Sequence, residues 1–177
     1  RFFILKEGFV DVAALVENPN EFLEAKEITY GFKIYDSKNV VIAIRENTTF
    51  MDSGAKVLLF EPEIPIQNRT SARAVLEIRR VVWGKKDPVA LQLKIEQADP
   101  LLGDQFPRLV TRVKNEATDP YRNIEVGAVI WADDQAVGVS RTIMDSININ
   151  EVRDLVFTWP KAISGVTRGE LFFRQLR

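Results

Sequence analysis

Residues 10–20 read "VDVAALVENPN": apolar residues alternate along a short run, and the run stops at an Asn-Pro-Asn turn. Alternation with a period of two is the pattern of a β-strand that buries one face. Residues 109–119 read "LVTRVKNEATD", which places Asn115 where Asn18 stands, 97 residues further along the chain. The same strand and turn occur twice, and this repetition predicts a duplicated β domain.

The alternation recurs along the whole first half of the chain, and turn-forming residues separate the apolar runs. After the opening strand the runs lie at residues 28–34, 40–45, 57–61 and 74–83. None of them has the sustained 3.6-residue spacing of an amphipathic helix. Short alternating runs separated by turn signals about every ten residues predict an all-β sandwich or barrel.

The second half repeats these runs at an offset of 94 to 98 residues. The matching runs are 28–34 with 124–130, 40–45 with 136–141, 57–62 with 155–160, and 74–79 with 169–174. This alignment places Arg141 opposite Arg45, and Pro160 opposite Pro62. We therefore predict two domains of one layout, residues 1–87 and 88–177, joined through a short polar segment near Trp83.

Composition excludes several classes of function. The chain of 177 residues is 46% hydrophobic, so a packed core is expected, and its 24 basic and 25 acidic residues leave a net charge of −1. That balance disfavours nucleic-acid binding, which gains affinity from cationic surfaces. The chain has neither cysteine nor histidine, which excludes disulfides, thiolate or imidazole metal sites, and Cys or His-dependent nucleophilic catalysis. We expect no cofactor, no metal and no enzymatic activity.

The segment "FKIYD", residues 32–36, resembles the strand after which the FxLYD family of bacterial Ig-like β-sandwiches is named, with Ile34 in place of Leu. The preceding "VENPN" is similar to the Asn-Pro-Asn signature of the type 2 late-embryogenesis-abundant domains, which share a similar sandwich. The second domain departs from the pattern, with Trp131 in the place of Tyr35, no following Asp, and no proline in its turn. The resemblance implies two tandem Ig-like (fibronectin III-like) antiparallel β-sandwiches in a secreted or membrane-anchored bacterial protein.

The function expected from this resemblance is that of a non-catalytic extracytoplasmic module for adhesion or surface display. Its expected partner is a protein or a cell-surface polymer and not a nucleic acid, and membrane association is expected only through an anchor upstream of Arg1. The sequence does not set an oligomeric state. Two alternatives stay open: a carbohydrate-binding module, and accessory domains of a larger cell-surface enzyme.

Tyr35 and Trp131 are the candidate ligand-binding residues. They occupy equivalent positions beside Ile34 and Ile130. Alternation places these isoleucines and Phe32 in the core, and it places both aromatic residues on the outer face of their strands. An exposed aromatic ring can stack on a sugar or hold a peptide. The competing interpretation, packing beneath a loop or between the domains, is favoured because strands are rich in aromatic residues for packing alone.

The remaining charged residues suggest sites only weakly. Turn carboxylates could bind calcium, but Asp is also a common turn former; these are Asp36, Asp133 and Asp134. Two pairs of carboxylates could serve as a hydrolytic acid and base; these are Glu61 with Glu63, and Glu17 with Glu21. The basic residues Arg79, Arg80, Lys85 and Lys86 form the only cationic cluster. Alternation predicts that Arg79 and Arg80 point to opposite faces, so we interpret the cluster as a solvated edge.

Overall fold

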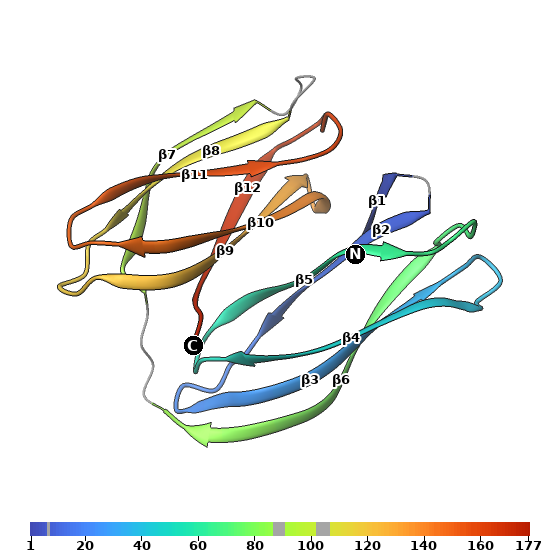
Figure 1. The fold of residues 1–177 in the computed structure, drawn as a ribbon, viewed down its shortest axis with the longest axis horizontal. Helices are drawn as coiled ribbons and strands as arrows, with labels where there is room; N and C mark the ends of the chain where they lie inside the picture. The colour runs from blue at the N-terminus through green and yellow to red at the C-terminus, as the bar shows by residue number, and fades with distance from the viewer. Residues whose placement is uncertain (7, 87–90, 102–106) are drawn as a thin grey trace. The chain divides into compact units, whose positions relative to one another are not determined.

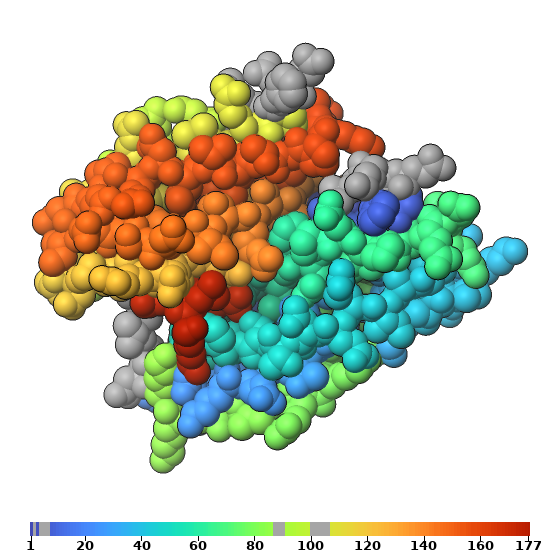
Figure 2. Space-filling view, viewed as in Figure 1, coloured from blue at the N-terminus to red at the C-terminus, as the bar shows by residue number. Residues whose placement is uncertain are grey.

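The computed structural model describes residues 1–6, 8–86, 91–101 and 107–177. Throughout these residues the chain is all-β, with antiparallel sheets, so the predicted class is confirmed. The described residues include no helix long and apolar enough to span a bilayer. The chain divides into two compact units, Arg1–Val89 and Ala90–Arg177. Figure 2 shows one outer face of the described residues with all atoms drawn.

The first unit consists of two antiparallel sheets of three strands each (Figure 1). One sheet has the order β1-β2-β5, with β1 at Phe2–Lys6, β2 at Phe9–Glu17 and β5 at Lys56–Pro65. The other has the order β4-β3-β6, with β3 at Leu23–Tyr35, β4 at Val41–Met51 and β6 at Arg73–Lys85. Consecutive strands therefore cross between the sheets after β2, β4 and β5.

The second unit has the same strand order, strand for strand. The order β7-β8-β11 is formed by Leu93–Leu101, Arg108–Asn115 and Val152–Thr158. The order β10-β9-β12 is formed by Tyr121–Ala132 as β9, Gln135–Ile147 as β10 and Arg168–Gln175 as β12. The repeat seen in the sequence is thus a repeat of topology, and β1 to β6 correspond to β7 to β12.

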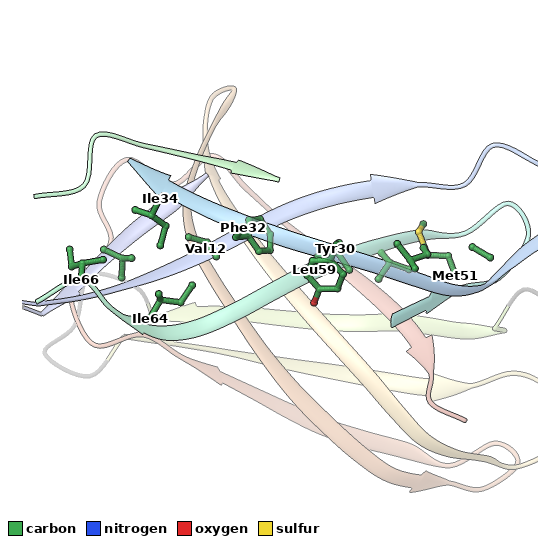
Figure 3. Packing of buried hydrophobic residues seen from close by; sticks show 12 residues of the cluster. Val12, Tyr30, Phe32, Ile34, Met51, Leu59, Ile64 and Ile66 are labelled. Atoms are coloured by element: carbon green, nitrogen blue, oxygen red, sulfur yellow. The ribbon is translucent and has the colours of Figure 1, made fainter. Parts of the chain in front are cut away.

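Each unit has one hydrophobic core to which both of its sheets contribute. In the first unit Val12 of one sheet lies near Phe32 of the other, and Leu59 lies near Tyr30 (Figure 3). Phe32 and Ile34 are buried, as alternation predicted. In the second unit the corresponding strand contributes Ile124, Val126, Ala128 and Ile130, all buried.

The predicted match of Arg45 with Arg141 is wrong. Arg45 pairs with core-facing Phe32, whereas Arg141 pairs with Gly127, which lies on the other face of its strand. The two hairpins differ in length, because Tyr35 pairs with Val41 but Ala132 pairs with Gln135. A register shift at Ala136/Gly138 adds to this difference. A slip of one residue moves a side chain to the opposite face.

The predicted match of Pro62 with Pro160 is also wrong, by two residues. Glu17 directly precedes Asn18 and pairs with Lys56, and Lys114 directly precedes Asn115 and pairs with Val152. Lys56 therefore corresponds to Val152. This register brings Glu61 level with Phe157. A shift of two residues keeps the same side chains inward, so an alternating pattern alone does not reveal it.

Val139 is buried, but it does not belong to the core cluster of the second unit. It pairs with Val129, on the face of β9 opposite the core residues Ala128 and Ile130. The register shift at Ala136/Gly138 adds one residue to β10 between the turn and Val139. The side chains after the shift therefore point to the face opposite the one that simple alternation from the turn would give.

Candidate functional site

Asn18 connects three segments at one end of the first unit. Its Nδ2 donates to the carbonyl oxygens of Leu23, at 2.7 Å, and Asp52, at 3.0 Å. Its Oδ1 accepts the backbone N–H of Asn20, at 3.2 Å, and its own N–H donates to Ala55 O, at 2.9 Å. The side chain thus joins the end of β2, the start of β3 and the turn between β4 and β5.

Asn115 makes the corresponding set of bonds in the second unit. Its Nδ2 donates to the carbonyl oxygens of Asp119, at 2.9 Å, and Ile147, at 3.4 Å, and its Oδ1 accepts the N–H of Ala117, at 2.9 Å. Its backbone N–H donates to Glu151 O, at 3.0 Å. Asn115 is fully buried, and Asn18 is 3% exposed. Both side-chain amides therefore hydrogen-bond to backbone groups of neighbouring segments. This shared role explains why this part of the sequence is repeated.

Tyr35 lies half-buried at the end of β3 and is directly paired with Arg73 of β6. The Arg73 guanidinium carbon lies 3.8 Å from the centroid of the Tyr35 ring, and the same guanidinium donates to Asn39 Oδ1. A cation over an aromatic face is attracted by the ring quadrupole. One face of the Tyr35 ring therefore carries an arginine of the same unit.

The turn beside Tyr35 is closed by Asp36. Its Oδ1 accepts the backbone N–H groups of Val40 and Lys38, both at 2.9 Å, and Arg69 Nη1 donates to its Oδ2 at 3.2 Å. The hydrogen bond from Val40, followed by those from Lys38 and Arg69, lowers the pKa of the Asp36 carboxyl. Asp36 therefore acts as a turn-closing acceptor.

Trp131 repeats the Tyr35 arrangement in the second unit. It pairs with Arg168 of β12, whose guanidinium carbon lies 4.6 Å from the ring centroid. Arg168 Nη1 also donates to the carbonyl of Asp133 at 2.9 Å, in the β9–β10 turn. Asp133 donates its N–H to Thr167 Oγ1 at 2.8 Å. The two predicted ligand residues thus occupy equivalent places, one in each unit, each under an arginine that also bonds its hairpin turn.

Glu61 forms a buried network that the sequence pattern did not identify as a cluster. Its Oε1 accepts from Tyr30 Oη at 2.7 Å and from Asn47 Nδ2 at 2.9 Å, and Arg45 Nε lies 3.9 Å from its Oε2. Glu63, its predicted catalytic partner, is exposed. Alternation within β5 does place Glu61 inward, but its partners come from β3 and β4. Of the other predicted pair, Glu17 and Glu21 are both exposed.

Glu125 of β9 is a second buried carboxylate, and the sequence pattern did not identify it. Arg141 Nη1 donates to its Oε2 at 3.2 Å and Arg174 Nη2 to its Oε1 at 2.5 Å. A buried carboxylate with two guanidinium partners has its charge compensated within its own sheet. The signal was present as one acidic residue flanked by Ile124 and Val126, at the start of the apolar part of β9.

The predicted geometry of the basic cluster is wrong, because Arg79 and Arg80 do not point to opposite faces. A register shift in the pairing of β6 with β3 makes Arg79 an extra residue, because Tyr30 pairs with Ile78 and Thr29 with Arg80. The Arg79 guanidinium covers the outer face of Gly31. Arg79 therefore lies on the same outer face as Arg80, and not opposite it. Arg79 pairs with Glu46 at 2.5 Å, and Arg80 with Glu27 at 3.6 Å.

The carboxylates do not gather into a metal site in the part of the chain that the structure describes, where no group of three or more is placed to hold an ion. The chain matches no family model and no curated protein.

Proposed function

We propose that this chain is a non-catalytic interaction module composed of two tandem Ig-like (fibronectin III-like) β-sandwiches. The sheet orders support the Ig-like assignment: β1-β2-β5 and β4-β3-β6 correspond to strands A-B-E and C′-C-F of that architecture. The shared core of the two sheets in each unit supports it as well. The repetition of the order in β7 to β12 extends the assignment to both units.

The observation that carries the non-catalytic proposal is the commitment of polar side chains to partners within their own unit. Glu61 accepts hydrogen bonds from Tyr30 and Asn47 on its Oε1, and Arg45 lies 3.9 Å from its Oε2. Glu125 accepts a hydrogen bond from one arginine on each of its two oxygens. Groups held in such networks stabilise the fold when every member is satisfied. Chemistry would require a carboxylate with an open side facing a substrate.

We place the module outside the cytoplasm, attached to the cell surface or secreted, as the resemblance of "FKIYD" to the FxLYD strand implies. Its partner is a protein or a cell-surface polymer, bound through loops, an outer sheet face or strand addition. Cysteine is not required for stability in such a compartment, since each unit has its own hydrophobic core.

A carbohydrate-binding role is the second candidate. The equivalent positions of Tyr35 and Trp131, each half-buried beside an exposed hairpin turn, favour it. The arginine over each ring reduces the area left for a sugar, because one face is already occupied.

The test is a binding and turnover screen of the full chain against peptides, bacterial surface polymers, glycans and ester substrates. The proposal expects binding without turnover. Turnover abolished by one Asp, Glu or Lys substitution that leaves the fold intact would overturn it. Glycan binding lost in Tyr35→Ala or Trp131→Ala, but kept in the exposed control Phe22→Ala, would establish the carbohydrate role instead.

A further inference from the structure

Strand β6 forms an edge of its sheet. In the order β4-β3-β6 it pairs with β3 on one side, and no other described strand pairs with it. Two large apolar residues are exposed along it, although their ladder partners face the core. Ile78 pairs with Tyr30 and is 45% exposed, and Trp83 pairs with Ala25 and is 49% exposed. A strand added at this edge would cover both.

The residues of β6 are arranged symmetrically about the register shift at Ile78 and Arg79. Glu77 and Arg80 flank the shift, opposite Gly31 and Thr29 on the outer face. Next on each side come Leu76 and Val81, opposite the core residues Phe32 and Ile28, and then Val75 and Val82. The outermost positions are Ala74 and Trp83, opposite Ile34 and Ala25. Each residue from Ala74 to Glu77 thus has a counterpart on the same face between Arg80 and Trp83, whereas Ile78 and Arg79, the two residues at the shift, lie on opposite faces.

This symmetry makes β6 complementary to a second β6 lying antiparallel beside it. A two-fold axis through the shift would place Glu77 opposite Arg80 of the other copy, and by symmetry Arg80 opposite Glu77. It would also place Leu76 opposite Val81, Val75 opposite Val82, and Ala74 opposite Trp83. Opposite charges and apolar pairs directly across a ladder stabilise it, and an interface that contains the same patch twice closes as a dimer.

We infer that two copies of this chain associate through their β6 edges in this register. The inference deepens the proposed interaction role, on which it rests, by naming a second copy as the partner. The present partners of Glu77 and Arg80 do not prevent it. Lys33 lies 2.7 Å from Glu77 and Glu27 lies 3.6 Å from Arg80, both at partly exposed positions where such pairs contribute little.

The test is sedimentation of the full chain from micromolar to millimolar concentrations, with charge-reversed variants. The wild-type chain should show a concentration-dependent dimer. Glu77→Arg and Arg80→Glu should each weaken association by about tenfold or more, because each places two pairs of like charges across the interface. The double variant should recover most of the affinity, since it exchanges the partners without changing the register.

Two further variants separate association from folding. Ile78→Lys should abolish the dimer while the thermal unfolding midpoint of the monomer stays close to wild type, because Ile78 is already partly exposed. Asp154→Arg, which reverses one member of the exposed Arg112–Asp154 pair of the second unit, should leave association unchanged. A chain that stays monomeric at millimolar concentration would overturn the inference, as would a dimer insensitive to both single reversals. Ligand binding is measured separately, so failure of self-association does not decide the proposed function.

Discussion

The two units differ most clearly at one position in their interiors. In the first unit, Tyr30 of β3 pairs with Asn47 of β4, and both donate to Glu61 of β5. In the second unit, Val126 of β9 pairs with Thr142 of β10, and Phe157 of β11 occupies the level of Glu61. A hydrogen-bonded cluster in one unit is thus replaced by apolar packing around Val126 and Phe157 in the other.

This difference shows that the fold does not require one particular set of side chains at the level of Glu61 and Phe157. Neither solution leaves an unmet hydrogen-bonding need at this level, since Glu61 has its donors and Phe157 is apolar and almost wholly buried. Replacing a buried polar group together with its partners can be nearly neutral, whereas removing one partner is costly. The asparagines, in contrast, are the same in both units and make the same bonds. The backbone turns require Asn18 and Asn115, while the interior requires only satisfied contacts.

The largest effects are expected from altering the shared feature. Asn18→Asp and Asn115→Asp replace an amide donor by a carboxylate that faces two carbonyl oxygens inside the protein. Each should lower the free energy of unfolding by about 3–5 kcal/mol, the cost of a buried charge without a partner. Denaturant unfolding at neutral pH measures this. Asn68→Asp, in an exposed turn, is the control, and a loss at Asn115 no larger than at Asn68 would refute the role assigned to the repeated asparagine.

Core truncations should affect both units similarly. Ile34→Ala and Ile130→Ala remove side chains that are almost completely buried at equivalent levels of β3 and β9. Each should cost about 2–5 kcal/mol through lost burial and a cavity. The exposed Ile143 provides the matched control, and its replacement by Ala should change stability by less than about 0.5 kcal/mol. Unfolding curves that show a loss of that small size at Ile130 would mean that the strand register is incorrect.

The interior difference can be tested by transplanting it. Glu61→Leu alone removes the acceptor of two hydrogen bonds and should cost about 1–3 kcal/mol. The triple variant Tyr30→Val, Asn47→Thr, Glu61→Phe introduces the arrangement of the second unit and conserves volume. It should lie within about 1.5 kcal/mol of the wild type, although it contains three substitutions. If calorimetry finds the triple variant less stable than Glu61→Leu, the two interiors are not interchangeable.

The smallest effects are expected at the turn carboxylates, one from each unit. Hydrogen bonds from Val40 N–H and Asn148 N–H, respectively, lower the pKa values of Asp36 and Glu151. Because these pKa values are depressed on folding, the carboxylates stabilise the protein above their unfolded pKa values, near 3.9 and 4.3. That stabilisation is lost as the pH falls through the folded values.

Asp36→Asn and Glu151→Gln should therefore reduce stability at pH 7 and lose less stability than the wild type on acidification. Comparing denaturation midpoints at neutral and acidic pH for each variant checks this. An unchanged acid dependence in Asp36→Asn would show that its carboxylate does not contribute through the turn.

The strands and the repeat could be predicted from the sequence because they depend on local pattern. Alternation identified the core residues Phe32, Ile34 and Ile130, and the repeated Asn18 and Asn115 marked equivalent turns. The pattern is local because the inward face of a strand is set by neighbours two residues apart. Nothing beyond pairing and burial was needed for these predictions.

Two of the errors have one cause, the irregularities of register. Arg79 was assigned to the wrong face and Arg141 to the wrong partner, and each lies at or after a register shift or a shortened hairpin. The position of a β-bulge depends on how a strand pairs with its neighbours, and no residue type in these runs predicts it. The Glu61 network was missed for a related reason, since its members come from three strands separated widely in sequence.

The central claim is that one buried asparagine holds the same three segments together in each unit. Deuterium exchange of the Asn side-chain amides, followed by NMR in the folded chain, tests it directly. The Nδ2 protons of Asn18 and Asn115 should exchange far more slowly than those of exposed Asn68, because both are buried and donate to backbone carbonyls. Exchange of the Asn18 and Asn115 amides at the rate of Asn68 would contradict the account.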